Sequence, residues 1–373
     1  MMRIGCLLVT LALLAGCTVT TPSSGDTKIR IGTFLSLTGP TQSFGVSSLN
    51  SFQLATDEVN RAGGINGKQV ELIAADDHSK TEDVVGVVTR LIEQDHVHAL
   101  LAEPVSTRAL AAAPLAQSRK VVMISAASVK PELTMQGDYI FRACFISSAE
   151  GEAIAKFAFE RLHAKTAAVL LDGANDYAVV LAGFFKESFV KLGGKVVDQQ
   201  TYAANDKDIS RQVTAIKSAK PDLIFAPGFY NTAGMVAAEV KRQQVGAALM
   251  GSDGWDSPEL LKANPADFDR VYFANHFWVG AEDPLVKKFV ADYSAKYGVA
   301  PDALAAASYD AARLLFQAIK TANSLESAAI RDALAQSKDF PGVTGRITLD
   351  ANRNANVPVY MLRINGGKYS LQQ

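Results

Sequence analysis

Residues 57–68 read Asp-Glu-Val-Asn-Arg-Ala-Gly-Gly-Ile-Asn-Gly-Lys, and they mark the end of the first predicted helix. The pattern predicts an amphipathic helix over 47–61, and the glycine pair at 63–64 ends it. A strand-like run at 28–35 precedes this helix, and another at 69–75 follows it. This order predicts two parallel strands that are joined by a crossover helix.

The same alternation of strands and helices continues beyond the first unit. Apolar strands separated by helices of about 10–15 residues are typical of parallel sheets that are covered on both faces. Further strands are predicted at 97–102, 121–125, 167–171, 195–202, 222–226 and 248–251. Further helices are predicted at 82–94, 107–118, 150–163, 177–192, 209–218 and 232–244.

The C-terminal part changes character, because three predicted helices follow one another there without a strand. The helices are predicted at 284–297, 303–322 and 325–336, and short strands follow at 346–349 and 359–364. The simplest arrangement returns the helices to the first run of strands and lets the last strands complete the second. We therefore expect an α/β fold with two doubly wound, Rossmann-like lobes and a cleft between them.

The lobes are expected to be joined by a three-crossover hinge, with crossings near 145, 277 and 345. The N-terminal lobe is predicted to comprise 28–145 and 277–344. The C-terminal lobe is predicted to comprise 146–276 and 345–373.

The first 17 residues have the layout of a lipoprotein export signal. A basic start, Met1–Arg3, precedes an apolar run that ends in Leu-Ala-Gly-Cys at 14–17. Small residues before a cysteine suit lipoprotein processing, so we expect Cys17 to be lipidated; an ordinary secretory signal is the alternative. Residues 18–27 have the composition of a linker. We expect an exported, periplasmic or cell-surface protein on a lipid tether, and the sequence leaves open which membrane carries it.

Composition excludes several classes of function. The 373 residues suggest about two domains, and a hydrophobic fraction of 48% allows large cores. The net charge is −1 with interleaved signs, which argues against nucleic acid as a partner. Cys144 lies in an apolar run, which favours a buried, inert thiol over a nucleophile. His96 and His98 lack a third ligand, so we expect no metal site and no cofactor.

Several short blocks together resemble the periplasmic amino-acid-binding proteins of the leucine/isoleucine/valine type, the receptor subunits of ABC importers. The blocks are Ile29–Pro40, Phe44-Gly45, the 57–68 stretch, Ala75–Asp77, Pro104–Thr107 and Gly251–Trp255. The resemblance covers nearly the whole mature chain and implies a type I periplasmic binding protein fold. It also implies an ABC permease as partner. We expect a monomer.

In the first lobe, the predicted site lies where the strand at 97–102 turns into a helix. Ligands of open α/β sheets bind beyond the carboxyl ends of strands. Ser106 is a good N-cap residue, and the free amides of a helix start suit a carboxylate. The resemblance implies that Ser106 and Thr107 hold the ligand carboxylate; simple capping of the helix would use the same donors.

The turn after the next strand reads Ser-Ala-Ala-Ser-Val at 125–129. The resemblance implies that the carbonyl of Ala127 binds the ligand ammonium. It also places Val129 where the family has a threonine that contacts the ligand. Valine lacks the hydroxyl, which removes a contact worth about 1 kcal/mol. Ser128 would replace that hydroxyl only if the loop shifts.

In the second lobe, Asp253 falls where the family has a glutamate, and the resemblance implies that it pairs with the ligand ammonium. Helix capping is the alternative, although Asp256 and Ser257 are better placed for it. A carboxylate in a closing cleft needs a cationic partner. Aromatic residues at predicted strand ends are expected to form the walls of the site: Phe44, Tyr177, Phe229, Tyr230 and Trp255.

The leading interpretation is a solute-binding lipoprotein of an ABC importer, not an enzyme, that closes on a branched-chain or other apolar amino acid. A ligand sensor of the same fold, a binder of another carboxylate and a structural lipoprotein remain as alternatives. A hydrolase is disfavoured, because no nucleophile–base pair is visible in the sequence.

Overall fold

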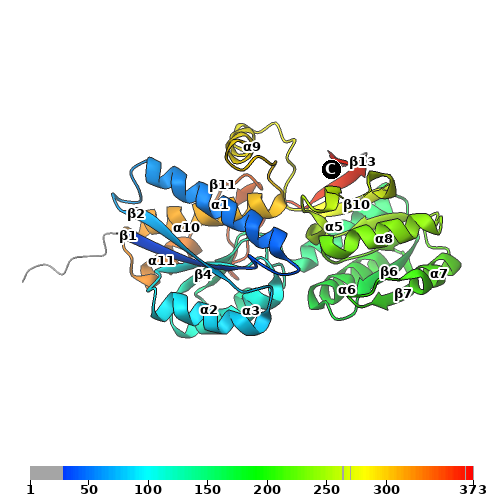
Figure 1. Ribbon diagram of the computed structural model, residues 1–373, viewed down its shortest axis with the longest axis horizontal. Coiled ribbons are helices and arrows are strands. Elements are labelled where there is room, and N and C mark those ends of the chain that lie inside the picture. The colour runs from blue at the N-terminus through cyan, green and yellow to red at the C-terminus, as the bar shows by residue number, and fades with distance from the viewer. Residues whose placement is uncertain (1–27, 263, 269, 366, 373) are drawn as a thin grey trace, which may run out of the picture.

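The computed structural model describes residues 28–262, 264–268, 270–365 and 367–372, and it contains two main sheets that lie side by side (Figure 1). The predicted signal at 1–17, its lipidation site Cys17 and the linker at 18–27 lie outside the described residues. Within the described ranges, no helix has both the length and the hydropathy that a membrane crossing requires.

The first sheet has five parallel strands in the order β2-β1-β3-β4-β5. The strands are β1 Lys28–Leu35, β2 Gln69–Asp76, β3 Ala99–Ala102, β4 Val122–Ser125 and β5 Ile140–Arg142. The helices between them are α1 Gln42–Arg61, α2 Thr81–Glu93, α3 Ser106–Ser118 and α4 Glu132–Met135.

Helices cover both faces of this sheet. Figure 1 shows α2 and α3 below the sheet and α1 above it. Leu100 packs in the cluster under α2 and α3, whereas Leu101 packs in the cluster under α1. This alternation follows from the two-residue period of a strand and explains why β3 is apolar throughout.

The second sheet has seven strands in the order β14-β13-β10-β9-β8-β6-β7. Its strands are β6 Thr166–Asp172, β7 Lys195–Tyr202, β8 Leu223–Phe225, β9 Ala248–Gly251, β10 Val271–Asn275, β13 Tyr360–Asn365 and β14 Lys368–Leu371. The helices are α5 Ser147–Lys156, which runs on into a π-helical turn at Phe157–Arg161, α6 Asp176–Lys191, α7 Ser210–Ala219 and α8 Tyr230–Arg242. Short 3₁₀ turns follow β9 at Asp253–Trp255, Leu260–Lys262 and Pro265–Phe268. The last two strands run antiparallel to their neighbours.

The three C-terminal helices return to the first sheet and share its core with α1. They are α9 Pro284–Tyr297, α10 Ala303–Ala322 and α11 Ser327–Ala335. We call the first sheet with its helices the N-terminal lobe and the second sheet with its helices the C-terminal lobe.

The placement of 345–373 in the C-terminal lobe is wrong for residues up to Ala355. Strand β12 (Arg346–Ile347) pairs with β11 (Phe340–Pro341) in a small separate sheet. Ile347 and Ala355 pack in the N-terminal core, so the chain reaches the second sheet only at β13.

Helix α1 begins at Gln42, earlier than the predicted start at 47. Gly45 explains the difference: a Cβ at this position would lie 2.1 Å from the carbonyl oxygen of Ser36. Only glycine therefore lets the first turn of α1 lie against the end of β1. This turn carries Phe44, which is buried.

Candidate ligand-binding site

A small pocket with a cavity volume of about 30 Å³ lies between the two lobes, and the loops at the strand ends line it. Seven predicted site residues line the pocket: Phe44, Ser106, Ala127, Val129, Tyr177, Phe229 and Asp253. Four residues that the sequence analysis missed complete the lining: Pro104, Val105, Gly254 and Leu304.

The start of α3 forms the N-terminal side of the pocket. Val105, with φ −76° and ψ 122°, is the cap residue, so the prediction of Ser106 as the N-cap is wrong by one position. Hydrogen bonding within the helix begins with Arg108, whose N–H donates to the Val105 carbonyl at 3.1 Å. The amides of Ser106 and Thr107 precede this bond and lie at the positive end of the helix, which suits an anion. The half-buried side chain of Thr107 does not line the pocket.

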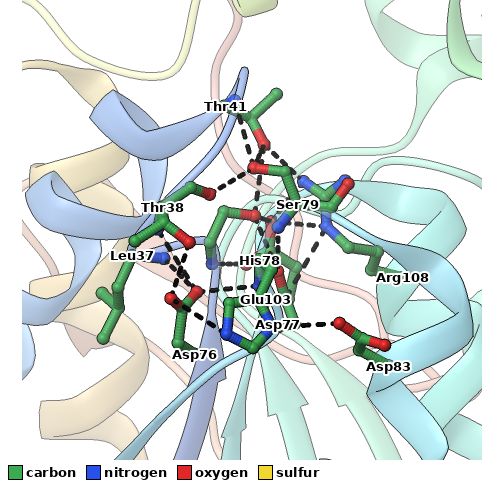
Figure 2. A network of polar contacts seen from close by, with 11 residues as sticks. Leu37, Thr38, Thr41, Asp76, Asp77, His78, Ser79, Asp83, Glu103 and Arg108 are labelled. Carbon is green, nitrogen blue, oxygen red and sulfur yellow. Dashed lines mark hydrogen bonds and ion pairs between the residues drawn. The ribbon is translucent and has the colours of Figure 1, made fainter.

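A buried polar network holds this helix start in place (Figure 2). Arg108 Nη2 lies 2.8 Å from Glu103 Oε1 and also donates to Thr41 Oγ1 at 2.8 Å. Its Nε lies 3.7 Å from Asp77 Oδ2. The Ser36 N–H donates to Glu103 Oε2 at 2.9 Å. The network thus ties together the loops that follow β1, β2 and β3.

The acidic partners in this network explain why Arg108 is tolerated in the first turn of α3, where a positive charge is normally unfavourable. A cation in the first turn opposes the helix dipole by about 0.3–1 kcal/mol. Glu103 and Asp77 are fully buried and offset that effect by pairing with Arg108. Burial raises the pKa of Glu103 to about 7 and also raises the pKa of Asp77, although Arg108 acts in the opposite direction on both.

The turn after β4 offers backbone groups but no hydroxyl to the pocket. Val129 is 1% exposed, and its carbonyl accepts a hydrogen bond from the Ser147 N–H at 2.8 Å. Ser128 is fully buried outside the pocket lining, and its N–H donates to Ser125 Oγ at 3.0 Å. Ser128 therefore does not replace the hydroxyl that Val129 lacks.

Asp253 forms the polar part of the C-terminal side. Its Oδ1 accepts a hydrogen bond from the Tyr177 hydroxyl, and its Oδ2 lies 2.7 Å from His276 Nε2. Its N–H donates to Glu150 Oε1 at 3.0 Å. Burial and the nearby Asp253 charge raise the pKa of Glu150 and of Tyr177, so both groups favour their protonated forms.

Aromatic rings from both lobes form the apolar walls. The rings of Phe44 and Phe229 meet edge to face with centroids 5.6 Å apart. Tyr177 stacks on Phe229 with centroids 5.3 Å apart and planes at 7°. Aromatic pairs of this kind contribute about 0.5–1.5 kcal/mol beyond their buried area.

Tyr230 and Trp255, two of the predicted wall residues, lie outside the pocket lining. The Tyr230 hydroxyl donates to the Pro40 carbonyl at 3.1 Å and accepts from the Ser43 N–H at 3.4 Å, so it bridges the lobes beside the pocket. Trp255 is 1% exposed and belongs to the C-terminal core. Its ring lies over Gly251, where a Cβ would come within 2.3 Å of it.

Glu150 and His276 complete the site, and the sequence analysis missed both. His276 directly follows β10, so the rule that places ligands at strand ends could have found it. Glu150 lies in the first turn of α5, and no sequence signal points to it.

The structure also describes Cys144, which the sequence predicts to be a buried thiol. Burial raises the pKa of the Cys144 thiol to about 12, as an inert thiol requires. Among the residues that the structure describes, no three His, Cys, Asp or Glu side chains are grouped to hold a metal ion.

The chain is similar to known proteins along most of its length. A family model described as periplasmic binding protein matches residues 28–368. The Leu/Ile/Val-binding protein BraC3 of Rhizobium johnstonii is 28% identical over 86% of this chain and 87% of its own length. A leucine-, isoleucine-, valine-, threonine- and alanine-binding protein of Pseudomonas aeruginosa is 25% identical over 87% of each chain.

Two solved structures of similar proteins also match this chain over most of its length. The leucine-binding protein LivK of Thermotoga maritima has a TM-score of 0.88 and 31% identity, over 92% of this chain and 98% of that one. The branched-chain amino acid binding protein LivJ of Streptococcus pneumoniae, solved with isoleucine, has a TM-score of 0.87 and 33% identity, over 93% and 98%.

Proposed function

This chain belongs to the periplasmic binding protein family, and from that membership we propose that it binds an apolar amino acid between its lobes and delivers it to an ABC permease. Family members work outside the cytoplasm. The relatives named above bind leucine, isoleucine and valine, which supports a branched-chain ligand.

One observation carries the proposal: the start of α3, at Val105 and Ser106, and Asp253 line the same pocket. An amino acid carries a carboxylate and an ammonium group, and these two features complement them. We place the ligand carboxylate at Ser106 and its ammonium between the Ala127 carbonyl and Asp253.

The apolar walls of the pocket determine which ligand side chains it accepts. Phe44, Phe229 and Leu304 offer apolar surface to the side chain of the ligand. Burying an aliphatic side chain there contributes about 1.5–3 kcal/mol. A charged side chain would lose its hydration without gaining a partner.

The candidate site residues are divided between the two lobes, so a ligand that contacts all of them favours closure of the lobes. Ser106 and Ala127 belong to the N-terminal lobe, whereas Tyr177, Phe229 and Asp253 belong to the C-terminal lobe. A ligand shifts the equilibrium toward the closed form only through contacts that the open form lacks. Here those contacts are the ones to the second lobe, and the closed form is the state that docks on the permease.

We also propose that lipid on Cys17 and the linker at 18–27 hold the monomeric receptor near its permease.

A carboxylate without an amino group is the second candidate ligand. Val129 offers no hydroxyl, and both oxygens of Asp253 already have partners, Tyr177 and His276. These features reduce the binding free energy that the site gains from a ligand's ammonium group.

Isothermal titration with leucine, isoleucine, valine and phenylalanine tests the proposal. The substitution Ser106→Ala should weaken binding of the best amino acid about 5- to 10-fold, because it removes one hydrogen bond. Ser118→Ala, at the exposed far end of the same helix, is the control and should change nothing. The proposal fails if no amino acid binds, and the second candidate gains if a simple carboxylate binds more tightly than every amino acid.

A further inference from the structure

The carboxylate of Asp253 is held by the protein itself before any ligand contact is considered. Its side chain is buried, with 7% exposure. Tyr177 donates to one oxygen, and His276 Nε2 lies 2.7 Å from the other. A buried carboxylate with two donors has lost much of the energetic need for a further cationic partner.

His276 is fixed in this position from several sides. It is 1% exposed, and its backbone N–H donates to Asn275 Oδ1 at 2.9 Å. Its ring stacks on Phe145 with centroids 3.8 Å apart and planes at 18°. Phe145 lies between β5 and α5, where the chain first crosses between the lobes, and His276 lies between β10 and α9, where it crosses back. The imidazole is therefore held between two hinge segments and cannot easily leave Asp253.

His276 is also the only cation-forming side chain that the described part of the chain places within 4 Å of the Asp253 carboxylate. Tyr177 is a neutral donor with a raised pKa. Glu150 receives the Asp253 N–H, and burial favours its neutral form. The charge balance on this side of the pocket therefore depends on the pair of Asp253 and His276.

We infer that His276 sets the ligand specificity of the site by competing with the ligand's amino group for Asp253. With His276 present, an ammonium group adds little to the affinity, and the site accepts an amino acid and the matching carboxylic acid to a similar degree. Without His276, Asp253 lacks one donor, so an ammonium group becomes strongly favourable. This inference rests on the proposed function, because it places the amino group of the ligand beside Asp253.

Leucine and 4-methylpentanoate are the probes for this inference, because they share carboxylate and side chain and differ in the amino group. The measured quantity is the ratio of their dissociation constants, 4-methylpentanoate over leucine, at one pH. The wild-type ratio is expected to lie below about 10, and His276→Phe should raise it by about 10- to 100-fold, the range of a charge-assisted hydrogen bond. Phenylalanine keeps a ring on Phe145 but makes no bond to Asp253.

A double-substitution cycle separates specificity from stability. In an Asp253→Asn background, His276→Phe should leave the ratio unchanged, because the charge that both groups address is gone. Phe189→Leu is the control, since it removes buried packing in the C-terminal lobe without touching His276 or Asp253; it should lower the melting temperature and leave the ratio unchanged. His276→Asn, too short to reach Asp253, serves as a second variant if His276→Phe does not fold.

The possible outcomes are distinguishable. If leucine binds and the ratio stays the same in both His276 variants, the inference is overturned and the proposed function stands. A wild-type ratio above about 10 overturns the inference without any variant, because it shows that the ligand's ammonium group contributes to affinity beside an intact His276. If neither probe nor any other amino acid binds, the proposed function fails and the inference fails with it.

Discussion

The rings of Phe44 and Phe229 meet edge to face at 88°, one from each lobe. Phe44 lies in the first turn of α1, and Phe229 immediately precedes α8. Because the two elements belong to different lobes, this contact joins the lobes. If the lobes close on a ligand as we propose, closure assembles this apolar wall, and we expect ligand affinity to depend on it.

Phe229→Ala should weaken leucine binding by about 10- to 100-fold, the equivalent of the apolar contact of one large side chain. The reason is the loss of both the stack on Tyr177 and the edge contact with Phe44. Titration calorimetry gives the affinity. Val236→Ala, in the core of the C-terminal lobe, is the control and should lower stability while affinity stays the same. Equal losses of affinity in both variants would contradict the assigned role of Phe229.

Tyr230→Phe should speed ligand release and weaken binding about 2- to 5-fold, because the hydroxyl bridges the lobes through Pro40 and Ser43. The melting temperature without ligand should change little, since the half-buried ring remains. Stopped-flow fluorescence measures the release rate. Tyr202→Phe removes a hydroxyl that bonds to Thr232 within one lobe, so its release rate should match that of the wild type. An unchanged release rate in Tyr230→Phe would rule out this bridge as a contributor to closure.

Val129→Thr should increase the affinity for amino acids by about 2- to 10-fold, because it restores a hydroxyl beside the ligand. The same hydroxyl lacks a partner without ligand, so the melting temperature of the free protein should fall. Differential scanning calorimetry with and without leucine shows both effects as a larger ligand-induced shift. Affinity that falls in this variant would show that the ligand does not approach Val129.

The free energy of unfolding should decrease as the pH rises from about 5 to 7.5. Burial raises the pKa of Glu103 from its ordinary 4.5 to about 7, so between these values the folded protein binds more protons there than the unfolded chain does. The stabilisation is complete below pH 4.5 and is lost as the pH rises through 7, by about 1–3 kcal/mol for this group. Urea unfolding at several pH values measures it.

Glu103→Gln should flatten this dependence, whereas Glu152→Gln, on the exposed face of α5, should leave it intact. A residual slope is expected, because burial also raises the pKa of Glu150 and of Asp302. An unchanged slope in Glu103→Gln would show that Glu103 does not titrate in this range.

Much of the fold could be read from local patterns. Helix α10 has the predicted bounds at 303 and 322, and β1, β7 and α9 also agree, because apolar periodicity and end signals are local properties. The start of α1 could not be predicted, since it depends on how closely Gly45 approaches Ser36. The point after Ala355 at which the chain leaves the N-terminal lobe for the second sheet also depends on packing between distant segments.

The candidate site likewise contains residues that the sequence could predict and residues that it could not. Residues at strand ends, such as Ser106 and Asp253, could be proposed because parallel strands bring their carboxyl ends to one edge. Sequence could not tell that Trp255 faces the core while Asp253 faces the pocket, because both lie in one short turn whose direction is set by packing against β9.

The sequence by itself determined the order of strands and helices, the two-lobed class of fold and the strand ends where a ligand would bind, because these follow from local periodicity and from short motifs. Only the tertiary structure decided which side chains share the pocket, and it brought His276 to Asp253 and Arg108 to Glu103. Those pairings arise from the burial of charged groups whose partners are chosen by the packing of whole elements, and no local pattern encodes that choice.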